Sequence, residues 1–353
     1  MSYKKIKFIV PIILLFALNL SAQDIASGIK LIKNEKYSEA KKYFAPLTNT
    51  KSAPEAYFYL GQIYFSEEKF DSARINYSKG IEKDKDFAPN YAGLVKVYNV
   101  EKNTSLVNKN EEEALDLGED NPDTYIALSE AYSNPKVKNY DKAIELLKSG
   151  IKVNSKYTPS YIALGKVYLL KTNGTDAAKN FQTAIDLDGT NAEALTLKAK
   201  IYVLVNNYKE ATTLLEEAIT KDPAYAPAYY ELAELNSTLR DYAKAADYFG
   251  KYMEASEVTL EKRRRFASIL YLNKEYSKSI NILEDVIKTE PDNPVATRML
   301  AYSYLKLEDT EKSMSFFKKL FDMPSIEYLP SDYENYADLL SETGNDSLAR
   351  EYM

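Results

Sequence analysis

The 353-residue chain contains no histidine, no cysteine and no tryptophan. Without histidine it lacks the commonest general base and metal ligand. Without cysteine it lacks thiolate nucleophiles, disulfides and the usual zinc ligands. No glycine-rich phosphate-binding loop occurs, and no spacing among the 52 acidic residues singles out a catalytic pair. These absences predict a protein that is not an enzyme, with no catalytic residues, no metal site and no cofactor.

Glycine and proline are also scarce, with 11 and 13 residues. Such a composition suits a mostly helical protein better than a turn-rich β protein. Hydrophobic residues make up 45% of the chain and charged residues 28%, so the chain can bury a core and keep a polar surface.

The first 22 residues differ from the rest of the chain. "MSYKKIK" carries three lysines, an uncharged run follows from Phe8 to Leu20, and "SAQD" comes next. This is the order of a secretory signal peptide, and we expect cleavage between Ala22 and Gln23. The alternative is an uncleaved membrane anchor, which is disfavoured because Pro11 interrupts a run that is short for a span of about 20 residues.

A signal peptide over 1–22 predicts an exported, bacterial-type protein that is periplasmic or associated with the cell surface. No cysteine follows the cut to carry a lipid, so we expect no stable membrane insertion after cleavage. Loss of the three early lysines leaves 43 basic against 52 acidic residues. This negative balance disfavours binding to nucleic acid or to an anionic membrane.

The rest of the chain repeats itself every 34 residues. Ala177, Ala211, Ala245 and Ser279 are separated by this interval. Each unit holds two stretches of helical periodicity joined by a short polar turn, such as "RDY" at 240–242. A repeated pair of helices of this length cannot bury its apolar face alone, so neighbouring units should stack and share one core.

The repeated pattern resembles that of the tetratricopeptide repeat family. The unit at 192–225 shows the pattern, with Lys198 in place of the usual leucine, at the following positions: Leu195, Ala199, Tyr202, Ala211, Leu215, Ala218 and Pro223. The resemblance implies an all-α fold, a right-handed α-α superhelix of about ten helix-turn-helix repeats over 23–353. The units begin near residues 21, 54, 88, 122, 158, 192, 226, 260, 294 and 330, and the last is incomplete.

One unit departs from the pattern, and the 31 tyrosines largely follow it. In the third unit, Val107 and Glu111 stand where alanine and an aromatic residue are expected, which predicts a shifted or loosely packed second helix. Seventeen tyrosines fall at three recurring packing positions, for example Tyr161, Tyr168 and Tyr242. An aromatic stripe at helical spacing is usually core, so these rings should pack between helices with their hydroxyls near turns or water.

Candidate binding residues are those that the packing pattern leaves over. In the family, the first helices line a concave surface, and outward residues lie one and five places after the early aromatic position. These slots, or the turn after them, supply the candidate partner-binding residues Phe58, Lys96, Lys166, Lys200, Tyr230, Arg264, Tyr271, Arg298 and Tyr302.

Four of these candidates predict a patch of guanidinium and aromatic groups: Arg264, Arg298, Tyr271 and Tyr302. Such a patch suits recognition of a carboxylate or a peptide backbone. The competing interpretation is a solvated face, because charge runs usually face water. In that case the arginines should pair with nearby acids, for which the sequence offers Glu257, Glu261 and Glu308.

Two hypotheses of function follow. The first is a non-enzymatic scaffold of the bacterial cell envelope that binds a protein or peptide along its concave face, as part of an envelope complex. The second is a binder of carbohydrate or cell-wall fragments that uses exposed concave aromatics, for which the sequence offers Phe58, Tyr230, Tyr271 and Tyr302. A shared fold does not decide between them.

Overall fold

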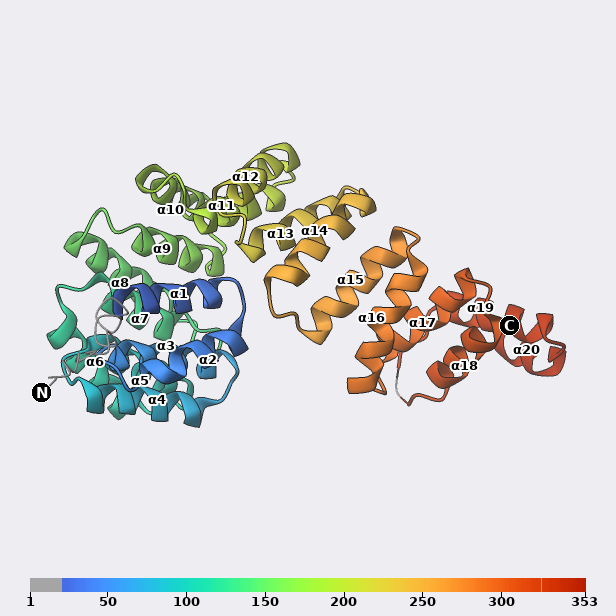
Figure 1. Cartoon of the computed structure of the whole chain (residues 1–353), viewed down its shortest axis with the longest axis horizontal. Coiled ribbons are helices and arrows are strands. Elements are labelled where there is room, and N and C mark those ends of the chain that lie inside the picture. Colours follow the sequence, from blue (N-terminus) through green and yellow to red (C-terminus); the bar gives the residue numbers. More distant parts are fainter. Residues whose placement is uncertain (1–20, 325) are drawn as a thin grey trace, which may run out of the picture. The chain divides into compact units, whose positions relative to one another are not determined.

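A computed structural model describes residues 21–324 and 326–353 (Figure 1). These residues form 20 α-helices and no strand. Residues 1–20 of the predicted signal peptide lie outside the described part of the chain. Within that part, no helix is both long enough and apolar enough to cross a membrane.

The helices form two compact units, which are described separately. The first unit ends at Tyr225 and contains α1 to α12, and the second runs from Ala226 to Met353 and contains α13 to α20. In both, consecutive helices pair as hairpins and each hairpin contacts the next. The predicted all-α fold of helix-turn-helix repeats is confirmed, and it is consistent with an α-α superhelix.

The first unit holds six hairpins. Their first helices are α1 (Ser21–Lys33), α3 (Ala53–Ser66), α5 (Ala88–Val100), α7 (Pro122–Ser133), α9 (Thr158–Leu170) and α11 (Ala192–Leu204). Their second helices are α2 (Tyr37–Leu47), α4 (Phe70–Lys83), α6 (Thr104–Gly118), α8 (Tyr140–Val153), α10 (Gly174–Leu187) and α12 (Tyr208–Lys221).

The second unit holds four hairpins. Their first helices are α13 (Ala226–Thr238), α15 (Leu260–Leu272), α17 (Pro294–Lys306) and α19 (Pro330–Glu342). Their second helices are α14 (Tyr242–Ala255), α16 (Tyr276–Thr289), α18 (Thr310–Phe321) and α20 (Asp346–Tyr352).

Every hairpin turns through one residue of left-handed conformation. In the turn after α5, Lys102 has φ of 58°, and the amides of Lys102 and Asn103 donate to the carbonyls of Asn99 and Tyr98, at 3.1 and 2.9 Å. This is the usual double hydrogen bond of a helix C-terminus. The Asn103 side chain then accepts from the Leu106 amide at 3.2 Å and caps α6. Nine of the ten such residues in the described chain are not glycine, and Gly344 is the tenth.

Because glycine adopts this conformation without steric cost, Lys102→Gly is expected to stabilise the first unit by about 0.5–1 kcal/mol. Lys102 is exposed, and its side chain bonds to none of the described residues. The reverse change at the equivalent position, Gly344→Ala, should destabilise the last hairpin by a similar amount. Urea denaturation followed by circular dichroism measures both. Loss of stability in Lys102→Gly would show that the turn is held by other forces.

Small residues allow large rings to pack between the helices. Tyr77 of α4 is fully buried against Gly61 of α3 and Gly93 of α5. A methyl group at either glycine would lie within 2.4 Å of the ring, closer than atoms can approach. The same relation joins Phe181 of α10 to Gly165 of α9. Close approach of the helices therefore depends on these glycines.

The seventeen tyrosines at the recurring positions are mostly half-buried. Tyr132 and Tyr304 are buried, whereas Tyr333 is exposed. The hydroxyls of Tyr125 and Tyr161 donate to carbonyls in the preceding turns, at 3.1 and 2.9 Å. Their rings thus cover helix contacts while their hydroxyls reach the turns, as amphipathic side chains do.

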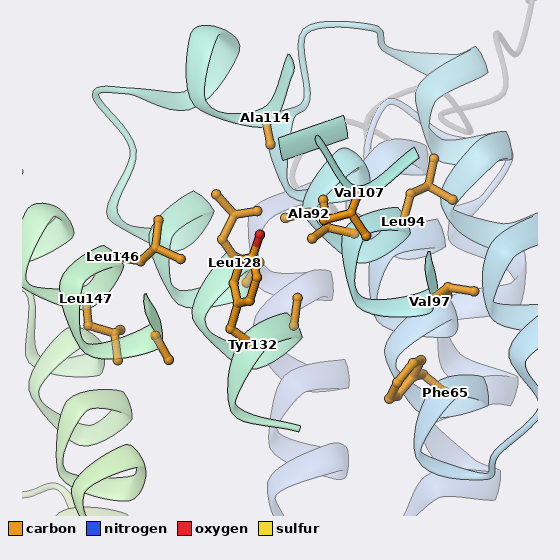
Figure 2. Close-up of a cluster of buried hydrophobic side chains, with 14 of the residues drawn as sticks. Phe65, Ala92, Leu94, Val97, Val107, Ala114, Leu128, Tyr132, Leu146 and Leu147 are labelled. Atoms are coloured by element: carbon orange, nitrogen blue, oxygen red, sulfur yellow. The ribbon is translucent and has the colours of Figure 1, made fainter. Parts of the chain in front are cut away.

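In the irregular third unit, α6 begins at the expected place and packs fully on α5, so the expected shift is wrong. Its sparse contact with α7 agrees with the looser packing that is the other expectation. Val107 and Ala114 of α6 are buried and face the cluster that contains Leu128 and Tyr132 of α7 (Figure 2). Glu111, which takes the place of an aromatic residue, accepts a hydrogen bond from the Tyr132 hydroxyl. A polar contact here replaces the usual ring packing.

Candidate functional site

The first helices of the first unit enclose a pocket of about 720 Å³. Its walls come from α1, α3, α5, α7, α9 and α11 and from the residues just before α5, α7 and α9, with Tyr37 of α2 at one edge. A pocket of this size is within the range of ligand sites, and it lies on the side that the sequence pattern predicts for partner binding.

Two of the first helices, α3 and α7, send matching stripes of side chains into the pocket. On α3 the stripe is Glu55, Phe58 and Gln62, with spacings of three and four residues that keep them on one face. The same positions on α7 hold Asp123, Ile126 and Glu130. The sequence pattern identified the second and third members of each stripe. The first member lies one turn earlier and was missed, although the same periodicity would have found it.

A hydrogen-bonded network crosses the centre of the pocket. The Lys96 ammonium donates to Gln62 Oε1 at 2.7 Å and to Glu130 Oε2 at 3.0 Å, and the Gln62 amide donates to the same Glu130 oxygen at 3.0 Å. Burial alone would raise the pKa of Glu130, but the charge and hydrogen bond of Lys96 outweigh it and lower that pKa. Three helices are thereby joined across the pocket floor.

A second ionic cluster connects the ends of the unit. Glu193 of α11 pairs with Lys166 of α9 and with Lys33 of α1, the latter at 3.0 Å, while Lys30 pairs with Asp222 at 3.3 Å. Burial would raise the pKa of Glu193, yet the two lysines hold it at about 2. Burial likewise lowers the pKa of Lys166, but Glu193 more than offsets this and raises it. The N-terminal helix is thus tied to the sixth hairpin.

Glu193→Gln is expected to loosen α1, because it removes the charge that holds Lys33 and Lys166. Amide hydrogen exchange of α1 should quicken several-fold, whereas Glu217→Gln on the exposed face of α12 should leave it unchanged. Because the pKa of Glu193 is lowered in the folded protein, its carboxylate stabilises the fold at pH values above the ordinary pKa of 4.5. This stabilisation is lost as the pH falls toward about 2. The protection factors of the α1 amides in the wild-type protein should therefore fall over that pH range. Protection factors that stay the same at about pH 2 would contradict a stabilising role for Glu193.

The remaining walls of the pocket are apolar. Ile25, Ile29 and Ile32 form one face of α1, and Ile126 of α7 lines the same cavity. A neighbouring hollow of about 310 Å³ shares Ile126 with the pocket and continues along α9 past Leu170. The site therefore combines an apolar wall with paired charges, as a peptide-binding surface requires.

Three of the predicted site residues meet in this pocket: Phe58, Lys96 and Lys166. Phe58 is only 9% exposed, so the expectation of an exposed concave aromatic is wrong at this position. Its ring packs on Tyr59 and Phe87, with centroids 5.2 and 6.3 Å away. Lys200 lies on α11 and does not belong to the pocket lining.

The predicted arginines of the second unit are engaged by acids of the protein itself. Arg264 pairs with Glu290 at 2.6 Å. Arg298 makes two bonds of 3.0 and 2.9 Å to Asp332 and a third, of 2.7 Å, to the Glu327 carbonyl. These acids differ from those that the sequence suggested. They lie in the loops before α17 and α19 or in the first turn of α19, so spacing within one helix could not identify them.

The predicted tyrosines of the second unit also make internal contacts. The Tyr302 hydroxyl bonds to Asp332 at 2.6 Å, and burial together with this bond raises its pKa to about 12. Tyr230 packs on Phe249, with ring centroids 5.7 Å apart, and Tyr271 packs on Tyr276 at 5.3 Å. Their rings serve the helix packing of this unit, and none of them lies in the pocket of the first unit.

Comparison with known families matches the chain to tetratricopeptide repeat models. The matched residues are 25–88, 168–233, 226–259 and 299–325, which together cover about half of the chain. They include helices of both units.

Several characterised proteins are similar over long stretches. BBSome complex member BBS4 of Bos taurus is 24% identical over 61% of this chain and 48% of its own length. TPR repeat-containing protein YpiA of Bacillus subtilis is 22% identical over 86% of this chain and 63% of its own. The APC/C hetero-tetramer Cut9-Hcn1 contains a chain with the same fold, with a TM-score of 0.50 and 13% identity over 86% of this chain and 58% of that one. The chain spans about half to two thirds of these proteins.

Proposed function

Because the chain belongs to the tetratricopeptide repeat family, we propose that it is a scaffold that binds a protein or peptide in the pocket of its first unit. Proteins of this family are generally protein-interaction scaffolds and typically lack catalytic activity. The similar proteins include a named member of a protein complex and a chain of a hetero-tetramer, which supports a protein partner.

The observation that carries the proposal is the pocket itself. Its apolar wall suits side chains of a bound segment, and its polar stripes offer carboxylate, amide and ammonium groups to a peptide backbone. The second unit offers less, because Arg264 and Arg298 contact protein carboxylates and line neither of the pockets described for that unit. Binding along the first helices of the first unit is therefore favoured over binding at the predicted arginine patch.

We further propose that the scaffold acts in the bacterial cell envelope. The support for this location is the order of lysines, apolar run and small residues over 1–22, which is that of an export signal. A partner encountered after export would be an envelope protein.

Ile126→Glu tests the proposal because it places a charge on the apolar wall. On an array of overlapping peptides from envelope proteins, the wild-type protein should bind particular peptides. Ile126→Glu should bind the same peptides about tenfold more weakly, because a charge on the apolar wall is costly to bury under a bound peptide. The matched control is Ile75→Glu, at a side chain of α4 that is 53% exposed, which should bind as wild type does. Retention of glycans but of no peptide would contradict the proposal and favour a carbohydrate binder.

A further inference from the structure

We infer that the end of the pocket formed by α3 and the start of α7 is a subsite for a basic side chain of the bound peptide, a lysine or an arginine. The inference rests on the proposed function and names the chemistry that this end of the pocket selects. Three observations carry it: a carboxylate without a partner among the described residues, a second carboxylate that pairs with no lysine or arginine among them, and rings around both.

The first carboxylate belongs to Glu55, in the first turn of α3. Its Oε2 atom is buried from solvent and accepts no hydrogen bond from the described residues. Within the described chain no lysine or arginine forms an ion pair with it. Burial of a carboxylate oxygen without a partner is costly unless a ligand supplies the missing donor.

The second carboxylate is Asp123, in the first turn of α7. The Tyr157 hydroxyl donates a hydrogen bond to its Oδ1 atom at 2.6 Å. The negative charges of Asp123 and Glu55 act on the Tyr59 phenol and, after burial, contribute to its raised pKa. Both carboxylates therefore lie near the same ring.

The lysines of the pocket do not neutralise these two acids. Lys96 pairs with Glu130, while Lys33 and Lys166 pair with Glu193. The cations are thus committed to the centre and the far side of the pocket, and negative charge remains at the α3 end. A cationic group would complete the charge balance, whereas an anionic group would be repelled.

Aromatic rings border the same end. Phe58, Tyr59, Phe87 and Tyr157 all line the pocket, and the centroids of Phe58 and Tyr59 are 5.2 Å apart with planes inclined by 72°. Ring faces attract ammonium and guanidinium groups, most strongly where water is excluded. Rings together with two carboxylates favour the long apolar stem and charged tip of lysine or arginine.

The alternative interpretation is that Glu55 and Asp123 have only a structural role, as acids in the first helical turn that interact favourably with the helix dipole. It predicts that neutral variants lose a little stability and select no ligand. The subsite predicts instead that Glu55→Gln leaves the melting temperature unchanged or raises it, because an uncompensated charge is removed.

The binding test uses a library of nine-residue peptides with random flanks and a central lysine, arginine, norleucine or glutamate. The wild-type protein should retain the lysine and arginine peptides about tenfold better than the norleucine peptides. Glu55→Gln combined with Asp123→Asn should abolish that preference, so that lysine, arginine and norleucine peptides are retained alike. Glu112→Gln combined with Asp116→Asn, at exposed sites on α6, removes the same charge and should keep the preference.

The outcomes separate this inference from the proposed function. Suppose that the wild-type protein binds norleucine peptides, that Ile126→Glu abolishes this binding, and that the wild-type protein shows no preference for basic peptides. The inference of a basic subsite is then wrong, whereas the proposed scaffold function stands. A preference that persists in the double variant also overturns the subsite. If no peptide of any class is retained, both proposals fail.

Discussion

Replacing Asp332 with alanine is expected to destabilise the second unit by about 3–5 kcal/mol, the usual cost of breaking a buried ion pair. The Asp332 side chain has no exposed surface, and Arg298 opposite is only 16% exposed. Besides Arg298, it accepts from the Tyr302 hydroxyl at 2.6 Å and from the Leu329 amide at 2.8 Å. Its loss leaves the buried guanidinium without its counter-charge and removes one acceptor each from the Tyr302 hydroxyl and the Leu329 amide.

Amide hydrogen exchange of α17 and α19 measures this effect within the unit, since repeat arrays need not unfold in one step. Asp338→Ala, at an exposed position of the same helix, should change stability by less than about 0.5 kcal/mol. Removing both partners, as Asp332→Leu with Arg298→Met, should recover most of the loss because no charge stays buried. Equal effects of Asp332→Ala and Asp338→Ala would show that the pair has no structural role.

Tyr77→Ala is the second change with a large expected effect, a loss of about 3–5 kcal/mol from the first unit. The ring fills the space between Gly61 and Gly93, and its removal would leave a cavity there. Tyr77→Phe separates packing from hydrogen bonding. The Tyr77 hydroxyl is buried and has no partner among the described residues, so Tyr77→Phe should be neutral or stabilising by about 1 kcal/mol.

Chemical denaturation with far-ultraviolet circular dichroism measures both variants against wild type. We expect the free energy of unfolding of the alanine variant to be far lower than that of the phenylalanine variant. If Tyr77→Phe were as destabilising as Tyr77→Ala, the hydroxyl rather than the ring would hold the helices together. The conclusion that the Tyr77 ring stabilises the first unit by packing would then be wrong.

The fold could be predicted because it depends on local pattern. The 34-residue period, the small residues and the aromatic positions recur in most units, and each acts within one hairpin or between neighbours. The shift considered for the second helix of the third unit was wrong because a polar pair, Glu111 with Tyr132, can occupy a place that the pattern reserves for a ring.

The candidate site was predicted in part. The slots one and five residues after the early aromatic position led to Phe58, Lys96 and Lys166, which do line the pocket. The first slot of each stripe, with Glu55 and Asp123, was missed because the pattern was not extended one turn toward the helix N-terminus.

Some other contacts lie beyond what a repeat pattern contains. Lys33 meets Glu193 five hairpins away, because the curvature of the first unit brings them together. The partner of Arg298, Asp332, lies in the next hairpin after an irregular segment. Chain separation gives no signal for Lys33 with Glu193, whereas Arg298 and Asp332 are one repeat interval of 34 residues apart, a spacing that would have suggested this pair.

We propose above that a partner protein binds along the first helices of the first unit. Site-specific photo-crosslinking in living cells tests it most directly, with a benzophenone amino acid at Ile126 in the pocket or at Ile75 on exposed α4. The account predicts a discrete protein adduct from Ile126 that disappears in the Ile75 variant and weakens when Glu55 and Asp123 are neutralised. Adducts of equal yield from both positions, or none from Ile126, would contradict it.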